Sequence, residues 1–375
     1  MKDLLESEHI KLLTKANEKF PEIFSLEGVA LPDSSVIEQA SGHLAAAFTA
    51  SLVKEGQSVA DLTAGLGVNT YYFSLRASQV FAVEKNKTRY DCLVHNLKLG
   101  HRINVNCYNM DCEEWLRVCN FGFDIAYLDP SRRDFSQRYF LMKDYVPNID
   151  LIINELLKRN KAESPSDCNK LFIKLSPLLD ISSIFKDLPS VKGIYILEVK
   201  REVKELLVEL ELNELGNSFS PFIIPVILTD DKPPIFRAIK FNNKDNYPLQ
   251  FVDSPSNVVS GGFIYEPSPS LMKSGLFNEL GNHYQLIKFS KDTHLFYSNI
   301  LDLTFPGRIF KVKDIVGSRE LKKLKGSRYS VISRNHPAKA NELENRFHLK
   351  PDETNFLIAC SIRKHKAIFS TEKVL

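Results

Sequence analysis

The chain has 375 residues, of which 43% are hydrophobic and 25% are charged, a composition typical of a globular protein with two or three domains. No apolar run reaches the roughly 18 residues that a transmembrane helix needs, and the acidic residues 1–8 argue against a signal peptide, so we expect no membrane association. The six cysteines lack metal-ligand spacing and the nine histidines form no His-Glu-x-x-His motif, which favours a cytoplasmic protein with reduced thiols and no metal ion.

The net charge of +3 is unevenly distributed along the chain. Residues 301–375 contain 16 lysines and arginines but 8 aspartates and glutamates, a net of +8, so residues 1–300 carry −5. A basic region of this kind is a candidate surface for a polyanion. The alternative is the solvated, lysine-rich face of a small domain.

Residues 1–50 are predicted to form a helical extension. Polar residues at 33–35 can cap a helix, and apolar residues such as Ile37 and Leu44 then recur at helical spacing, which predicts a helix that packs on a core. Three polar residues of this segment, Gln39, Ser41 and His43, are candidates for contact with a ligand. The alternative is that they are ordinary polar residues of a helix surface.

Residues 59–70 predict a short buried strand, a glycine turn and a helix that begins near Thr70. Asp61 ends the strand, and Gly65 and Gly67 allow the backbone to turn sharply and to approach a ligand closely. The amides at the start of the helix point at the same spot. Doubly wound α/β sheets build nucleotide sites from units of this kind.

Further strands alternate with helices after this unit, which predicts a mostly parallel α/β sheet over residues 51–212. The predicted strands are residues 79–84, 103–108, 123–128 and 171–175, followed by a late pair at 193–199 and 205–210.

Acidic residues end four consecutive strands of this predicted sheet. They are Asp61, Glu84, Asp111 and Asp129. The carboxyl edge of an open α/β sheet is where ligands bind, and Glu84 follows Asp61 at about the distance expected of a ribose-binding acid. Because all four acids lie at the carboxyl ends of their strands, they predict a nucleotide-type ligand at this edge.

The pattern changes beyond residue 212. Residues 213–303 contain proline-rich turns and short apolar strands at 222–228 and 238–241, which predict a small α+β domain, with a strand at 263–267 and a helix at 271–280. Residues 304–375 form the basic region, with predicted helices at 318–325 and 338–347 and strands at 329–334, 356–360 and 367–369.

The run Asp-x-x-x-Gly-x-Gly at 61–67, together with the acids that end the next strands, resembles class I S-adenosylmethionine-dependent methyltransferases, which have a Rossmann-like fold. A dinucleotide fingerprint would need a third glycine, where this chain has Thr70. The resemblance implies that S-adenosyl-L-methionine is the cofactor. Its implied cofactor-binding residues are Asp61 at the amino end, Gly65 and Gly67 at the methionine part, Glu84 at the ribose and Asp111 at the adenine, together with Thr63, Lys85 and Asp129.

The glycine loop departs from the commonest form of that family, because Thr63 occupies the position of the usual first glycine. The variant Asp-x-Thr-Ala-Gly-x-Gly is similar to the loop of several RNA methyltransferases, including a family of guanine-N2 enzymes of the small-subunit rRNA. Those enzymes often carry an acid where this chain has Asn69.

The element Asp129-Pro130-Ser131-Arg132 is similar to the Asp-Pro-x-Arg element of RNA methyltransferases of the uracil-C5 and guanine-N1 types. A uracil-C5 enzyme needs a nucleophilic cysteine after the fifth strand, where this chain has residues 174–177, Lys-Leu-Ser-Pro. We therefore reject the covalent mechanism and expect direct in-line displacement.

In that mechanism the resemblance gives Asp129 the role of accepting a proton or hydrogen bond from the nucleophile, and Pro130 helps to shape the acceptor site. Arg132 and Arg133 are candidates for a phosphate clamp. The alternative for both arginines is a salt bridge with Asp134 or another acid.

The remainder of the chain resembles bacterial methyltransferases that carry a ferredoxin-like insert, here residues 213–303, and a C-terminal THUMP-like domain, here residues 304–375. The matching motifs are residues 129–134, 265–267, Gly307-Arg308 and 333–335. The resemblance implies that residues 304–375 hold RNA, in agreement with their positive charge. We expect methylation of a base nitrogen of RNA, in rRNA or tRNA. The alternatives are a methyltransferase of a protein or small molecule, and a non-catalytic RNA-binding protein.

Overall fold

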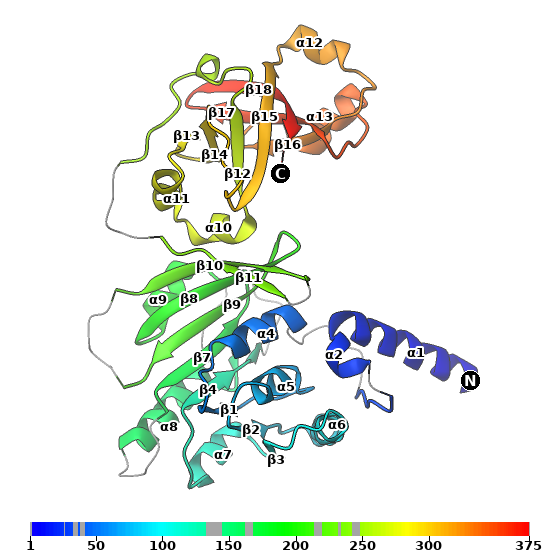
Figure 1. The fold of residues 1–375 in the computed structure, drawn as a ribbon, viewed down its shortest axis with the longest axis vertical. Helices are drawn as coiled ribbons and strands as arrows, with labels where there is room; N and C mark the ends of the chain where they lie inside the picture. The colour runs from blue at the N-terminus through cyan, green and yellow to red at the C-terminus, as the bar shows by residue number, and fades with distance from the viewer. Residues whose placement is uncertain are drawn as a thin grey trace. The chain divides into compact units, whose positions relative to one another are not determined.

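The computed structural model describes residues 2–25, 27–32, 37, 42–132, 145–161, 168–213, 220–231, 234–241 and 248–374. The chain forms two compact units, Met1–Ala238 and Ile239–Leu375 (Figure 1). In the described part of the chain, no helix is long and apolar enough to cross a membrane.

The first unit is built on a nine-stranded sheet with the order β11-β10-β8-β9-β7-β4-β1-β2-β3. Its strands are β1 (Ser58–Asp61), β2 (Gln79–Val83), β3 (Val105–Tyr108), β4 (Ile125–Leu128), β7 (Lys170–Leu175), β8 (Val191–Val199), β9 (Glu202–Glu211), β10 (Phe222–Thr229) and β11 (Ile235–Ala238). Strands β3, β2, β1, β4 and β7 run parallel, whereas β9 is antiparallel to both β7 and β8. This confirms the predicted Rossmann-like α/β class.

Helices cover both faces of this sheet (Figure 1). They are α1 (Lys2–Lys19), α2 (Pro21–Phe24), α4 (His43–Ser51), α5 (Val68–Ser74), α6 (Lys87–Leu99), α7 (Cys112–Val118), α8 (Ile149–Lys161) and α9 (Ile181–Asp187), with a small hairpin of β5 (Ser131–Arg132) and β6 (Tyr145–Val146). The helical extension predicted at the N-terminus therefore contains α1 and α2. Ile37 is also helical, residues 33–36 and 38–41 of the predicted helix lie outside the described residues, and α4 begins at His43 with Gly42 as its N-cap.

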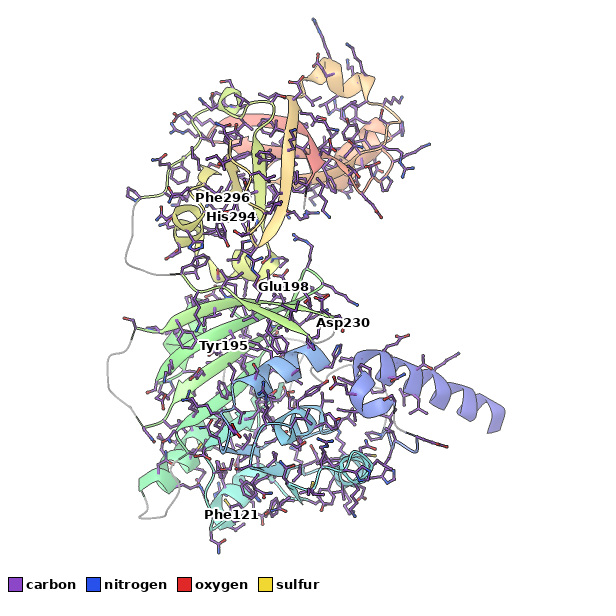
Figure 2. The ribbon with its side chains drawn as sticks, in the orientation of Figure 1. Phe121, Tyr195, Glu198, Asp230, His294 and Phe296 are labelled. Atoms are coloured by element: carbon purple, nitrogen blue, oxygen red, sulfur yellow. The ribbon has the colours of Figure 1, made fainter. Side chains whose placement is uncertain are left out.

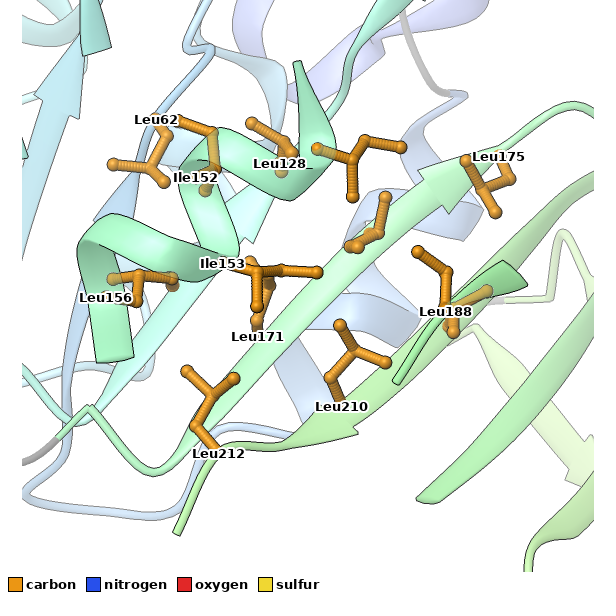
Figure 3. Close-up of a cluster of buried hydrophobic side chains, with 14 of the residues drawn as sticks. Leu62, Leu128, Ile152, Ile153, Leu156, Leu171, Leu175, Leu188, Leu210 and Leu212 are labelled. Atoms are coloured by element: carbon orange, nitrogen blue, oxygen red, sulfur yellow. The ribbon is translucent and has the colours of Figure 1, made fainter. Parts of the chain in front are cut away.

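The two cores follow from the alternation of side chains along the strands. In β4, Ala126 and Leu128 pack with α7, α8 and α9, whereas Ile125 and Tyr127 pack with α4 and α5. Figure 3 shows the first core, where isoleucines of α8 lie against leucines of the central strands. Because both faces are covered, the central strands are mostly apolar, as is typical of parallel sheets, apart from polar residues near their ends such as Asp61 and Lys174.

Strand β10 corrects one prediction. Residues 222–228 were expected in a separate α+β domain, yet β10 pairs in parallel with β8 in the large sheet. Its residues Ile224, Val226 and Leu228 are buried in the same core as Leu197 of β8. The proline-rich turns predict a domain boundary near residue 212. The partner of a strand, however, depends on long-range packing, about which turn residues carry no information. The first unit instead extends to Ala238.

The second unit contains a seven-stranded sheet with the order β13-β14-β12-β15-β18-β17-β16. Its elements are β12 (Phe263–Pro267), α10 (Pro269–Ser274), α11 (Phe277–His283), β13 (Ile287–Ser290), β14 (Thr293–Ser298), β15 (Gly307–Ile315), α12 (Ser318–Lys323), β16 (Ser330–Arg334), α13 (Ala340–Phe347), β17 (Asn355–Ile362) and β18 (His365–Lys373). A short 3-10 turn, η2, spans Pro255–Asn257.

Two further boundaries differ from the predictions. Strands β12 and β15 are antiparallel neighbours, so the predicted division at 303/304 crosses a continuous sheet. The helix predicted over 271–280 is two helices, because Gly275 has a φ of +71° and ends α10. A left-handed glycine is a common helix terminator, and its position was visible in the sequence.

Candidate active site

A cavity of about 570 Å³ lies at the carboxyl edge of the large sheet. It is lined by the residues that follow β1, β2, β3 and β4 and by those that end β7 and begin β9. The predicted site residues that line it are Thr63, Gly65, Glu84, Lys85, Asp111, Asp129 and Pro130. The expectation that the strand ends meet at one edge therefore holds for most of the set.

Glu84 is fixed by the glycine loop. Its carboxylate accepts hydrogen bonds from the backbone N–H of Gly65 at 2.9 Å and of Asn86 at 2.7 Å. Gly65 has a φ of +55°, a left-handed conformation that favours glycine. The side-chain amide of Asn109 also donates to the backbone carbonyl of Glu84 at 2.8 Å. A buried acid held by two backbone donors is a preorganised acceptor at the wall of the cavity.

Asp61 lies beneath the loop and does not line the cavity. Its carboxylate is fully buried and accepts hydrogen bonds from the Thr70 hydroxyl at 2.6 Å and from the Thr63 N–H at 3.3 Å. Burial raises the pKa of Asp61 to about 7, although the hydrogen bonds from Thr70 and Thr63 oppose the shift. Asp61 therefore ties the loop to the first turn of α5.

Gly67 also lies outside the cavity lining. It has a φ of +83° and caps α5, and a Cβ at this position would lie 2.3 Å from Cδ1 of the buried Leu93. The structure thus requires Gly67 for the close approach of the loop to α6.

Asp129 and Lys174 form a salt bridge at the opposite side of the cavity. The Lys174 ammonium donates to Oδ2 of Asp129 at 2.7 Å, and the backbone N–H of Asp129 donates to the Thr63 hydroxyl at 2.7 Å. Burial opposes the charge of Lys174, but the carboxylates of Asp129 and Glu205 outweigh it, so the pKa of Lys174 is raised. The lysine is therefore a permanent cation between two acids.

Asp111 and Asn69 line the cavity at other points. Asp111 is the N-cap of α7, where its carboxylate accepts from the N–H of Glu113 at 2.9 Å. Asn69 is buried, and its Oδ1 has no hydrogen-bond partner among the described residues. A buried amide oxygen without a donor is costly, so Asn69 marks a point where a ligand could donate a hydrogen bond.

Two residues of this site, Lys174 and Glu205, were not predicted from the sequence. Lys174 lies in the segment after the fifth predicted strand where a covalent enzyme would carry its cysteine. That location was the feature of the sequence that could have indicated a site residue. Glu205 is 3% exposed and reaches the cavity because β9 begins at the edge where β7 ends. Only the antiparallel register of β9 reveals this.

The candidate phosphate clamp is largely outside the described residues. Arg133 and Asp134 fall in the segment that the structure does not describe, and Arg132 is described for its backbone in β5 but not for its side chain. Gln39 and Ser41 also lie outside the described residues.

His43 lies away from the cavity lining. Its Nδ1 contacts the carbonyl of Lys19 at 3.0 Å, and its Nε2 contacts Asp230, labelled in Figure 2, at 3.1 Å. These contacts join the N-terminal helices to the end of β10. The structure therefore gives His43 a packing role.

The six cysteines are free thiols. Cys112 lines the cavity, where burial raises the pKa of its thiol to about 12. A thiol in this state is protonated at neutral pH and is a poor nucleophile.

Comparisons with known proteins agree with this architecture. A family model described as a ferredoxin-like domain matches residues 263–306. All but the last three of these residues lie in the region 213–303, where a ferredoxin-like domain is predicted. The crystal structure of a candidate methyltransferase from Porphyromonas gingivalis W83 is 25% identical and has a TM-score of 0.82, over 97% of this chain and 88% of that chain.

A second relative is protein L320 of Acanthamoeba polyphaga mimivirus, which is described as uncharacterized. It is 31% identical over 137 residues, which are 35% of this chain and 51% of that protein. The chain thus spans about half the length of this curated relative. The Porphyromonas structure, in contrast, matches nearly the whole chain, and the two proteins have the same fold.

Proposed function

We propose that the chain is an S-adenosylmethionine-dependent methyltransferase that methylates a base nitrogen of RNA, in rRNA or tRNA, by direct in-line transfer. The observation that carries the proposal is the cavity at the carboxyl edge of the sheet, where acids from successive strands converge. The likeness over 97% of the chain to a candidate methyltransferase supports it.

The residues present fit this cofactor. A volume of about 570 Å³ is in the usual range for a cofactor site, roughly 300–1,000 Å³, and the buried Oδ1 of Asn69 needs a donor. We assign Glu84 and Lys85 to the ribose hydroxyls, Asp111 to the adenine amino group, and the loop at Thr63 and Gly65 to the methionine part. Asp61 and Gly67 act indirectly, by holding the loop.

When bound, S-adenosylmethionine supplies an activated methyl group. The chain has to bind the acceptor nitrogen in line with that group and manage its proton. Asp129 accepts a hydrogen bond from the acceptor N–H and takes the proton as the nitrogen gains its substituent. Lys174 holds the Asp129 carboxylate in place through their salt bridge, and Pro130 forms a buried wall of the acceptor site. The protonated Cys112 agrees with a mechanism that uses no covalent enzyme intermediate.

The choice of RNA as the substrate rests on the basic terminal region. Its net charge of +8 over residues 301–375 suits a polyanion, because phosphate neutralisation dominates affinity for nucleic acids. A base nitrogen in single-stranded or bulged RNA is the accessible target, since a paired base must first leave its stack.

The decisive experiment follows radiolabelled methyl from S-adenosylmethionine into total RNA from a strain that lacks the gene. We compare the wild type with Asp129→Asn and Glu84→Gln, and use Asp150→Asn, an exposed position of α8, as the matched control. Asp129→Asn should transfer methyl at least about 100-fold more slowly. Glu84→Gln should lose about 1–3 kcal/mol of cofactor affinity, and Asp150→Asn should behave as wild type.

Lys174→Gln supplies an independent readout within the same assay. Without the ammonium, Asp129 loses the partner that orients its carboxylate, so methyl transfer should be slower than in the wild type. An unchanged rate of methyl transfer would show that Lys174 does not position Asp129.

The alternatives give different results. Cofactor binding with no label in RNA would favour a protein or small-molecule substrate. Cofactor binding without turnover on any acceptor, with Asp129→Asn equal to wild type in cells, would favour a non-catalytic RNA-binding protein.

A further inference from the structure

A buried acid in the second unit pairs with two arginines from distant parts of the chain. Glu266 of β12 is 1% exposed. Nε of Arg308 in β15 donates to its Oε2 at 2.6 Å, and Nη2 of Arg334 at the end of β16 donates to its Oε1 at 2.7 Å. Three of the short motifs noted in the sequence, at 265–267, 307–308 and 333–335, therefore meet at one point.

The sheet fixes this cluster rigidly. Arg308 lies directly opposite Glu266 in the antiparallel register of β12 and β15. The backbones are close there, since a Cβ on Gly307 would lie 2.1 Å from the carbonyl oxygen of Glu266. The rings of Phe310 and Phe356 lie 5.4 and 5.8 Å from the guanidinium carbon of Arg308, distances at which cation–π attraction orients it.

The arginines face a polar cleft of about 630 Å³. Its polar and charged lining includes Arg308, Ser330, Ser333, Arg334, His336 and Lys339, and in the described part of the chain no acidic residue lines it. Glu266, which is buried behind the arginines, neutralises one of the two guanidinium charges. The cleft therefore keeps a net positive charge from the second arginine and from Lys339.

The donors of the arginines exceed what the acid can accept. Each guanidinium has five N–H donors, while Glu266 uses Nε of Arg308 and Nη2 of Arg334. The Nε of Arg334 is buried without an acceptor among the described residues. Nη1 of Arg334 donates to the carbonyl of Ser333 at 3.3 Å, and the two guanidinium groups keep further N–H donors at the cleft that suit an anion.

We propose that this cleft binds a phosphate group of a nucleic-acid strand. Two guanidinium groups and an ammonium offer donors from several directions, which suits the oxygens of a phosphodiester. Glu266 acts as the positioning residue that holds both arginines. The identity of the phosphate carrier as RNA rests on the proposed function, whereas the phosphate site itself rests on the geometry of the cleft.

The test measures binding of a fluorescent single-stranded RNA oligonucleotide to the full chain over a range of salt concentrations. Arg334→Gln and Lys339→Gln remove cleft donors. Lys322→Gln removes the same charge from an exposed position of α12, outside the cleft, and is the matched control. Circular dichroism checks that each variant is folded.

We expect Arg334→Gln to weaken RNA binding roughly tenfold or more. Both cleft variants should lower the slope of log affinity against log salt by about one. Arg334→Lys should recover the slope but not the full affinity, because an ammonium lacks the planar fork of donors. Lys322→Gln should leave both quantities near those of wild type.

Equal losses in Lys339→Gln and Lys322→Gln would overturn the proposal, because they would indicate a diffuse basic surface without a site. Lys339 is exposed, so this comparison stands even if Arg334→Gln fails to fold. Poly-glutamate is the second probe: an equal loss of its binding in the cleft variants would replace phosphate with any polyanion. Failure of methyl transfer with intact cleft-dependent RNA binding would refute the proposed function alone.

Discussion

Among single residues, the two acids of the glycine loop differ in what surrounds them. Glu84 lies at the cavity wall and accepts hydrogen bonds from two backbone N–H groups. Asp61 is fully buried and accepts hydrogen bonds from the Thr70 hydroxyl and the Thr63 N–H. Burial favours the protonated form of Asp61 and raises its pKa from 3.8 to about 7. The folded protein therefore holds a proton that the unfolded chain releases above about pH 4.

This proton makes stability depend on pH. The contribution of Asp61 is fully present below the unfolded pKa of 3.8 and is lost as the pH rises through about 7. The loss should approach about 1.4 kcal/mol per pH unit within that window. Asp61→Asn lacks the titration, so its free energy of unfolding should fall less between about pH 5 and pH 7.5 than that of wild type.

Urea unfolding at several pH values measures the difference. Asp150→Asn, at an exposed position, should follow the wild-type curve. Parallel curves for wild type and Asp61→Asn would contradict the assigned proton.

Among the elements, the turn between β1 and α5 depends on Gly67 for two separate reasons. Its φ of +83° is unfavourable for other residues, and Leu93 of α6 fills the space where a side chain would stand. Gly56 has a similar φ of +84°, but no other atom lies within 4 Å of the place that a Cβ would occupy. The pair therefore separates backbone strain from steric overlap.

Gly56→Ala should lower the free energy of unfolding by about 1–2 kcal/mol, the cost of a left-handed conformation. Gly67→Ala should lose about 1–3 kcal/mol more, because the methyl group overpacks the buried Leu93. Urea unfolding of both variants, followed by fluorescence, measures the two losses. Equal losses of free energy in the two variants would show that Leu93 of α6 moves aside without a measurable loss of stability.

Across the whole molecule, two compact units have separate apolar cores. The single tryptophan, Trp115, is 1% exposed in the first unit, on α7. Its fluorescence therefore reports the unfolding of the first unit, while circular dichroism reports both units.

We expect the two probes to give different thermal transitions. S-adenosylmethionine should raise the midpoint of the fluorescence transition, by the equivalent of about 2.7 kcal/mol at roughly one hundred times its dissociation constant. The transition assigned to the second unit should not move. A single coincident transition that shifts as a whole would contradict independent units.

The features of the fold that depend on local pattern could be predicted from the sequence. Apolar strands that alternate with helices indicated the parallel sheet, and the acids at Glu84, Asp111 and Asp129 reached one edge because parallel strands end together. The position of β10 beside β8 in the large sheet could not be predicted. The proline-rich turns around β10 indicated a separate domain instead. A strand carries little information about its neighbour, because its partner is set by burial of both faces.

The α/β class, the glycine turn and the set of acids at the sheet edge follow from the order of residues alone, because side-chain period, φ preference and strand polarity are local properties. Tertiary packing was needed to establish that Asp61 supports the loop from beneath, that Lys174 and Glu205 complete the cavity, and that Glu266 joins Arg308 and Arg334. Those residues lie far apart in the chain, and their contacts depend on strand order and register. Burial and charge then gave each of them a role that its residue type alone does not specify.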